Sequence, residues 1–145
     1  MNLWTIGFTK TSAERFFGQL MLSGAVRVVD VRLNNVSQLS GFAKRNDLAY
    51  FLRTICDMDY LHMPNLAPTA EMLGAYRKQE MTWDEYERQF LELMHERDIE
   101  TNTPRDSIAG SVLLCSEDKP VQCHRRLVAE YLAQRWGDID IRHLI

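Results

Sequence analysis

A segment in the C-terminal third of the chain combines thiols, an imidazole and a carboxylate within a short stretch. Cys115 and Cys123 lie on either side of Glu117, and His124 follows the second cysteine directly. A thiol becomes a nucleophile when it loses its proton, and a nearby imidazole or carboxylate can accept that proton. With an acidic residue from an earlier segment added, the candidate catalytic residues are Asp30, Cys115, Glu117, Cys123 and His124.

The residues around the second cysteine predict its local environment. Pro120 suits the first position of a helix, because its missing N–H leaves no hydrogen bond unmade there, so we expect a helix from about Pro120 to Trp136. Cys123 would then lie in the first turn, where free backbone N–H groups and the helix dipole lower the pKa of a thiol. Arg125 and Arg126 oppose that dipole, and a bound anion is the simplest partner that would compensate them.

Polar side chains also follow the other expected strands. Thr9 comes after the first strand, Arg32 after the second and Asn65 after the third. The carboxyl ends of parallel strands converge on one edge of a sheet, which is where open α/β sheets bind their ligands. The guanidinium groups favour an anionic ligand, such as a phosphate-bearing small molecule or a nucleotide. The candidate ligand-binding residues are Thr9, Arg32, Asn65, Arg125 and Arg126.

Other functions remain open for the same residues. Zinc or iron accepts sulfur and nitrogen donors, and a Cys/His metal-binding protein would use Cys115, Cys123, His124 and His62. A non-catalytic module that binds a ligand or nucleic acid would use a basic patch formed by Arg32, Lys44, Arg45, Arg125 and Arg126. Sulfur-transfer chemistry is a further alternative, which rests on analogy alone.

Each candidate also has a purely structural explanation. Cys115 would be a small buried hydrophobic residue at the end of a strand. His124 would be a hydrogen-bonded histidine of the core. Arg125 would hold the neighbouring loop by pairing with acidic residues, and Asp30 would do no more than neutralise Arg32.

The elements that position these residues alternate along the chain. Short apolar segments predict strands at residues 3–8, 27–31, 59–63, 111–115 and 139–144. Apolar residues at helical spacing predict helices that begin near Thr11, Asp47, Ala70, Thr82 and Pro120. This alternation predicts a single α/β domain over residues 1–145, with a mainly parallel, Rossmann-like sheet of about five strands and helices on both faces. The polar segment 101–110 predicts a surface loop.

Composition narrows the class of protein further. The chain has 145 residues, of which 46% are hydrophobic and 26% charged, as in an ordinary globular domain. Its net charge of -3 disfavours nucleic acid as the main partner, although a local basic patch would still allow it. No apolar run is long enough to cross a membrane, the N-terminus lacks signal-peptide features, and three cysteines suit a reducing compartment, so we expect a cytoplasmic protein. Composition identifies no cofactor.

Four groups of residues occur in an order that is typical of one family. They are Thr5-Ile6-Gly7, Val29-Asp30-Val31-Arg32, Tyr60-Leu61-His62 and the block Cys115…Glu117…Pro120…Cys123-His124-Arg125. In this combination nearly the whole chain resembles the DUF488 family, and the Cys-His-Arg block is the most specific part. The resemblance implies a compact α/β domain and no settled activity. Members commonly have histidine where this chain has Phe8, so a mechanism that needs that imidazole is not implied here.

Overall fold

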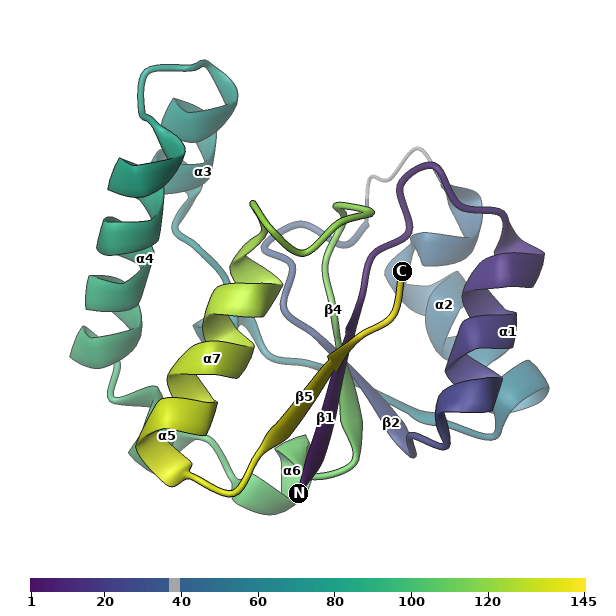
Figure 1. The fold of residues 1–145 in the computed structure, drawn as a ribbon. Helices are drawn as coiled ribbons and strands as arrows, with labels where there is room; N and C mark the ends of the chain where they lie inside the picture. The colour runs from purple at the N-terminus through teal and green to yellow at the C-terminus, as the bar shows by residue number, and fades with distance from the viewer. Residues whose placement is uncertain (37–39) are drawn as a thin grey trace.

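Five parallel strands form one sheet in the order β3-β2-β4-β1-β5 within residues 1–36 and 40–145, which the computed structural model describes (Figure 1). The strands are β1 (Asn2–Ile6), β2 (Arg27–Asp30), β3 (Asp59–His62), β4 (Ser111–Leu114) and β5 (Asp140–His143). In register, Ile6 of β1 and Asp30 of β2 both lie opposite Leu114 of β4. The carboxyl ends of the three central strands are therefore level, so the segments that follow them meet at one edge. This arrangement confirms the predicted parallel α/β sheet.

Helices cover both faces of the sheet (Figure 1). One face carries α1 (Ala13–Ser23) and α2 (Arg45–Phe51), which continues into a π-helical turn (Leu52–Cys56). The opposite face carries the longer helices α4 (Trp83–Glu96) and α7 (His124–Trp136). The remaining helical segments are α3 (Ala70–Arg77), α5 (Ile99–Asn102), α6 (Arg105–Ile108) and the 3-10 turns Gly41–Ala43 and Pro64–Leu66.

The central strands carry consecutive hydrophobic residues because each strand contributes to two cores. Successive side chains of a strand point to opposite faces, so Val28 packs with α1 and α2 while Val29 packs with α4 and α7. All four residues of β4 are buried. Burial on both faces is the property that removes the polar alternation from parallel strands.

Side-chain caps start three of the predicted helices, and Thr69 caps α3 by accepting a hydrogen bond from the Met72 N–H at 3.2 Å. The Ser12 hydroxyl accepts a hydrogen bond from the Arg15 N–H at 3.2 Å, and the Thr82 hydroxyl accepts one from the Glu85 N–H at 3.2 Å. Each cap satisfies a backbone donor that has no partner inside its helix. The helix expected to begin near Thr11 is therefore capped one residue later.

Two local predictions are wrong. Segment 101–110 is not a plain surface loop, because it contains the end of α5 and all of α6, whose Ile108 is buried in the core. The last helix begins at His124 and not near Pro120, because residues 120–123 form a turn in which the Cys123 N–H donates to the Pro120 carbonyl. Cys123 is consequently the N-cap residue of α7, with an extended backbone, and does not lie in its first turn.

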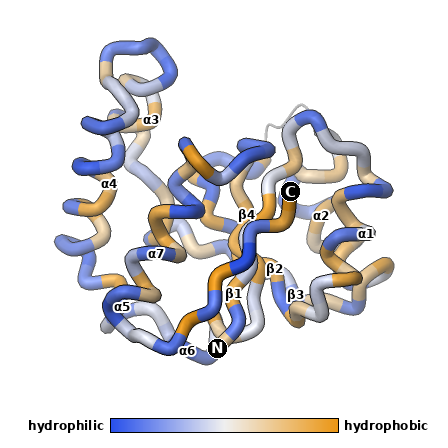
Figure 2. Tube along the Cα trace, in the orientation of Figure 1, coloured by the Kyte–Doolittle hydropathy of each residue, from blue (hydrophilic) through white to orange (hydrophobic). Residues whose placement is uncertain are grey.

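The α3–α4 pair projects beyond the carboxyl edge of the sheet (Figure 1), and the turn that joins the two helices is hydrophilic (Figure 2). Helix α4 carries aromatic residues that stack on one another, with Trp83 on Tyr86 and Tyr86 on Phe90. Among the described residues, no helix has the length and apolar character needed to span a membrane.

Candidate active site at the carboxyl edge of the sheet

The loop after β4 is fastened to the end of β1 by backbone contacts. The Ser116 carbonyl accepts hydrogen bonds from the Phe8 N–H at 3.2 Å, the Thr9 N–H at 3.0 Å and the Thr9 hydroxyl at 2.6 Å. Gly7 lies directly under this loop, and a Cβ atom there would overlap the Glu117 carbonyl oxygen. The absence of a side chain at Gly7 thus permits the close approach that positions Cys115.

Arg125 also holds the loop after β4 in place through side-chain hydrogen bonds. Its buried guanidinium donates to the Thr5 hydroxyl at 3.2 Å, to the Glu117 carbonyl and to the Asp118 carbonyl at 3.4 Å. The partners that compensate this arginine are therefore uncharged oxygens and not the anion expected from its place in the helix. Among the described residues no carboxylate pairs with it, so it remains a net positive charge beneath the loop.

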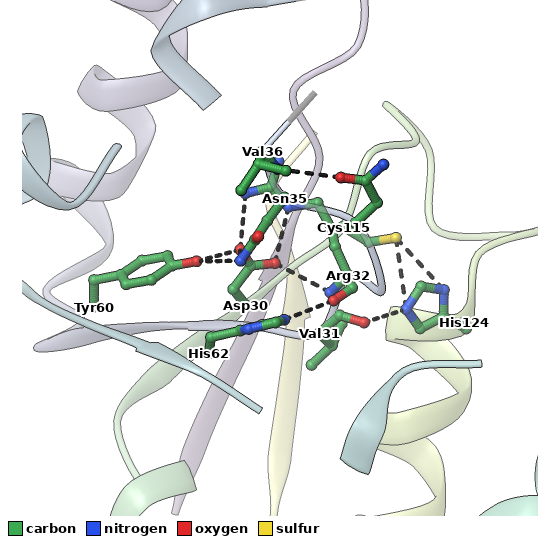
Figure 3. A network of polar contacts seen from close by, with 10 residues as sticks. Asp30, Val31, Arg32, Asn35, Val36, Tyr60, His62, Cys115 and His124 are labelled. Atoms are coloured by element: carbon green, nitrogen blue, oxygen red, sulfur yellow. Dashed lines mark hydrogen bonds and ion pairs between the residues drawn. The ribbon is translucent and has the colours of Figure 1, made fainter. Parts of the chain in front are cut away.

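Asp30 and Arg32 form a fully buried ion pair at the end of β2 (Figure 3). The Asp30 carboxylate accepts from the Arg32 Nε at 2.9 Å, from its Nη2 at 2.8 Å and from its backbone N–H at 3.1 Å. The Tyr60 hydroxyl donates to the same carboxylate at 2.5 Å. These contacts use the acceptor sites of Asp30, which neutralises Arg32 as the structural explanation expects.

One donor of this network is left over. The Nη1 atom of Arg32 is buried and has no hydrogen-bond partner among the described residues. Buried donors are normally satisfied by protein or by bound molecules, so an unpaired guanidinium nitrogen indicates a place where a ligand acceptor would fit. Arg32 itself lines the pocket described below.

Cys115 and His124 lie side by side, each almost completely buried (Figure 3). The Nε2 atom of His124 is 2.7 Å from the Val31 carbonyl oxygen and must carry the proton, because a carbonyl can only accept. The Nδ1 atom is then free to accept a proton, and it lies 3.5 Å from the Cys115 sulfur. The backbone of the β2 end thereby sets the imidazole tautomer that a thiol–imidazole pair requires.

The two nearby thiols differ in acidity, in the opposite sense to the sequence prediction. A hydrogen bond from the Cys123 thiol lowers the pKa of Cys115 and outweighs the effect of its burial, with help from the Ser116 N–H and the Arg125 charge. The same hydrogen bond and burial raise the pKa of Cys123 well above its ordinary value. Cys123 is the N-cap residue of α7, but its side chain makes no capping hydrogen bond, and the Cys115 contact together with burial outweighs the effect of the helix N-terminus on its pKa. Cys115 is therefore the more acidic of the two thiols.

A pocket of about 240 Å³ opens above these groups. Cys115, Cys123 and His124 lie on its wall together with Arg32, and the α3–α4 pair supplies the facing side. The complete lining is Arg32, Leu33, Asn34, Leu73, Tyr76, Arg77, Trp83, Tyr86, Cys115, Ser116, Glu117, Gln122, Cys123 and His124.

The structure separates the predicted site residues into three groups. The pocket wall includes Arg32, Cys115, Glu117, Cys123 and His124. Asp30, Thr9 and Arg125 lie behind that wall and support it through the hydrogen bonds already described. Asn65 and Arg126 lie outside the pocket lining: the first offers its carbonyl to Arg97, and the second pairs with Glu130 at 3.1 Å.

Sequence reasoning missed the aromatic side of the pocket. Tyr76 of α3 and Trp83 of α4 are half-buried and have their ring centroids 5.7 Å apart, and both line the pocket together with Tyr86. In the sequence these residues follow the amphipathic spacing of ordinary helices, so nothing distinguished them from core residues. Ser116 and Gln122 are the polar pocket residues that their position inside the Cys-His-Arg block could have indicated.

The same wall also offers a set of metal ligands. The side-chain donor atoms of Cys115, Cys123 and His124 all lie within 4.8 Å of one another. Two sulfurs and one nitrogen suit a soft or borderline ion such as zinc. The Val31 carbonyl fixes the orientation of the imidazole through its other nitrogen, as hydrogen-bond partners of ligand histidines do in metal sites. His62, the fourth predicted ligand, instead contacts the Arg32 carbonyl at 2.8 Å.

Comparison with known proteins gives one finding about identity. Residues 12–132 match the family described as "Domain of unknown function DUF488". No curated protein and no solved structure matches the chain. The matched range spans α1 to α7 and therefore includes the Asp30–Arg32 pair and the Cys115–His124 pair. This chain belongs to the DUF488 family.

Proposed function

We propose that this protein is an enzyme in which the Cys115 thiolate attacks an anionic, phosphate-bearing small molecule such as a nucleotide. The Cys115–His124 pair carries the proposal, because the thiol lies 3.5 Å from an imidazole nitrogen that the Val31 carbonyl leaves free to accept a proton. Proton transfer to Nδ1 produces a thiolate and an imidazolium. The thiolate forms a covalent bond to the substrate, and the imidazolium returns its proton to the leaving group.

The charges around Cys115 favour this assignment. Arg125 supplies an uncompensated positive charge, which stabilises a thiolate more than a thiol. Asp30 acts in the opposite direction, but its ion pair with Arg32 weakens the repulsion. The role proposed for Arg125 is thus to hold the loop and bias the thiol, and not to contact the substrate.

Arg32 is the group proposed to bind the anion. Arg32 lines the pocket, its buried Nη1 atom has no hydrogen-bond partner among the described residues, and its other nitrogens remain engaged with Asp30. Because the Asp30–Arg32 pair is neutral overall, a contact with Arg32 would orient a bound anion more than it would attract one. Arg77, an exposed pocket residue, adds the positive charge that attracts a phosphate group.

The aromatic side of the pocket favours a nucleotide among anionic ligands. Tyr76, Trp83 and Tyr86 face the same space as Arg32 and Cys115. Aromatic rings stack on nucleobases, and Gln122 offers both a donor and an acceptor to a base edge. A ligand with a planar ring and a phosphate would use both sides of the pocket.

The test combines binding with thiol reactivity. A nucleotide at about 100 times its Kd should stabilise the protein by about 2.7 kcal/mol, which raises Tm by roughly 5–10 °C. Arg32→Lys keeps a positive charge beside Asp30 but lacks the Nη1 donor, and should lose the shift. Arg142→Gln removes an exposed arginine of β5 whose partner is Asp140, and should keep it.

Iodoacetamide alkylation, followed by mass spectrometry, reports on the thiolate. Cys115 should react at a lower pH than Cys56, whose pKa is raised by burial, and His124→Gln should slow the reaction at neutral pH. A Tm shift with nucleotides and an unreactive Cys115 would refute the enzymatic proposal and favour a non-catalytic ligand-binding module. No shift with any nucleotide or sugar phosphate would refute the substrate class.

A metal centre is the second candidate function, because the donor atoms of Cys115, Cys123 and His124 converge within 4.8 Å. Three protein ligands beside an open pocket resemble the arrangement of catalytic zinc sites, which keep one position for water or substrate. Elemental analysis of the purified protein tests this. About one zinc per chain, lost in Cys123→Ser but retained in Cys56→Ser, would support the centre, and metal-free folded protein would refute it.

A further inference from the structure

The proposed nucleophilic mechanism leaves the second thiol of the pocket without a chemical step. The sulfur atoms of Cys115 and Cys123 lie within 4.8 Å of each other, and both residues line the same pocket. Cys56, the third cysteine, lies in the π-helical turn after α2 on the opposite face of the sheet. Only one cysteine pair among the described residues is therefore placed for a reaction between thiols.

The local backbone allows the two sulfurs to meet. Cys115 directly follows the buried strand β4, whereas Cys123 belongs to a turn and has an extended backbone at φ -139° and ψ 138°. A disulfide needs its sulfurs about 2.05 Å apart, so the pair must close by a few ångströms at most. Arg125 holds the first part of the connecting loop at the Glu117 and Asp118 carbonyls, whereas Lys119, Val121 and Gln122 beyond it are exposed, so the turn before Cys123 is the part that can adjust.

The two thiols have different neighbours and hence different roles. Cys115 contacts the proton-accepting nitrogen of His124, so it is the thiol that becomes nucleophilic first. The Cys123 sulfur lies within 4.8 Å of the Cys115 sulfur, and Cys123 lines the same pocket, so it can attack Cys115 after that residue has been oxidised. Two neighbouring thiols, one of them beside an imidazole, are the arrangement of a peroxide-reducing cysteine and its resolving cysteine.

We propose that Cys115 and Cys123 form a redox pair that reduces hydroperoxides and is converted to an intramolecular disulfide. The Cys115 thiolate attacks one peroxide oxygen, the O–O bond breaks, and the leaving oxygen takes the proton of the His124 imidazolium. Cys115 is then a sulfenic acid. The Cys123 sulfur attacks the Cys115 sulfur, the S–O bond breaks, and the hydroxide leaves as water with the proton of Cys123.

The electrons balance over this sequence. The two thiols lose two electrons in total, and the peroxide gains them as it becomes an alcohol or water. A dithiol reductant restores both thiols by exchange through a mixed disulfide. This activity uses the same Cys115 thiolate as the proposed function but needs no anionic substrate and no Arg32 contact, so a protein that binds no nucleotide could still carry it out.

The experiment treats the reduced, full-length protein with one equivalent of hydrogen peroxide and follows its intact mass. The expected product has lost the mass of two hydrogen atoms and regains it with a dithiol. A protease that cleaves after Glu117 separates Cys115 from Cys123, so the two peptides should remain joined until a reductant is added. This measurement uses the wild-type chain and does not depend on whether a variant folds.

Variants then assign the two roles. Cys123→Ser should gain one oxygen at Cys115, which a sulfenic-acid reagent captures, and should form no disulfide. Cys56→Ser, the matched control on the other face, should behave like the wild type. A wild-type protein that accumulates oxygen on Cys115 without a Cys115–Cys123 link would overturn the proposal, as would a disulfide that includes Cys56 or no reaction at Cys115.

Discussion

Replacing Gly7 by alanine tests how the loop after β4 is held. The added Cβ would overlap the Glu117 carbonyl oxygen and lie 2.9 Å from the Arg125 Nη1 atom. Neither neighbour can yield easily, because the carbonyl is backbone and the guanidinium is buried. The loop must therefore shift, which strains the packing and weakens the hydrogen bonds that Phe8 and Thr9 donate to Ser116.

The magnitude follows from these contacts. Overpacking of a well-packed site costs about 1–3 kcal/mol, and each weakened hydrogen bond adds about 0.5–1.5 kcal/mol. We expect Gly7→Ala to lower the free energy of unfolding by about 2–4 kcal/mol and Tm by roughly 6–12 °C. The matched control is Gly18→Ala in α1, where no atom lies within 4 Å of the new Cβ. There the better helix propensity of alanine should stabilise the protein by about 0.5–1 kcal/mol.

Urea denaturation of the wild type, Gly7→Ala and Gly18→Ala, followed by tryptophan fluorescence, measures the change in the free energy of unfolding of each variant. The two glycine variants should differ from the wild type in opposite directions. The Gly7→Ala loop should also place Cys115 differently, so its alkylation rate at neutral pH should change while that of Gly18→Ala does not. A Gly7→Ala protein within about 0.5 kcal/mol of the wild type would refute the close approach of the loop to β1.

Two further perturbations test the buried polar groups. Asp30→Asn leaves the Arg32 guanidinium buried without its counter-ion and should cost about 3–5 kcal/mol in urea denaturation, so a loss below about 1 kcal/mol would contradict the structural role of the pair. Burial, together with the Arg125 charge, lowers the pKa of His143, whose Nδ1 atom lies 2.6 Å from the Thr5 hydroxyl. The unfolded state therefore binds a proton more readily, and the free energy of unfolding should fall as pH drops below about 6.5. His143→Gln should flatten that part of the stability–pH curve, and an unchanged curve would show that His143 does not contribute.

Local patterns were sufficient to predict the architecture. The strands were predictable because consecutive residues such as Val28 and Val29 are buried on opposite faces of the sheet. Both positions of β2 are therefore apolar. Thr82 predicted a helix start because its hydroxyl can satisfy a backbone donor wherever the helix packs. Cys115 and His124 were predictable as neighbours because one ends a strand and the other begins the helix that follows.

The roles of the charged residues and thiols were decided by contacts between distant segments. Arg125 was expected to need an anion, but it donates to the Thr5 hydroxyl, which comes from the other end of the chain. Cys123 was expected to be acidic from its place in a helix, yet its contact with Cys115 and its burial raise its pKa. A local pattern cannot reveal such partners, because they meet only when the sheet brings its strand ends together.

The sequence by itself determined a parallel α/β sheet, the edge at which its functional groups gather and the family to which the chain belongs. The tertiary structure decided which thiol is the more acidic, which nitrogen of His124 faces Val31 and which faces Cys115, and which arginine has a buried nitrogen without a partner among the described residues. The physical reason is that the spacing of hydrophobic residues, which involves positions only a few residues apart in the chain, indicates which side chains are buried. Acidity and hydrogen-bond satisfaction depend on the few ångströms around each atom, and those surroundings come from β1, β2 and the α3–α4 pair together.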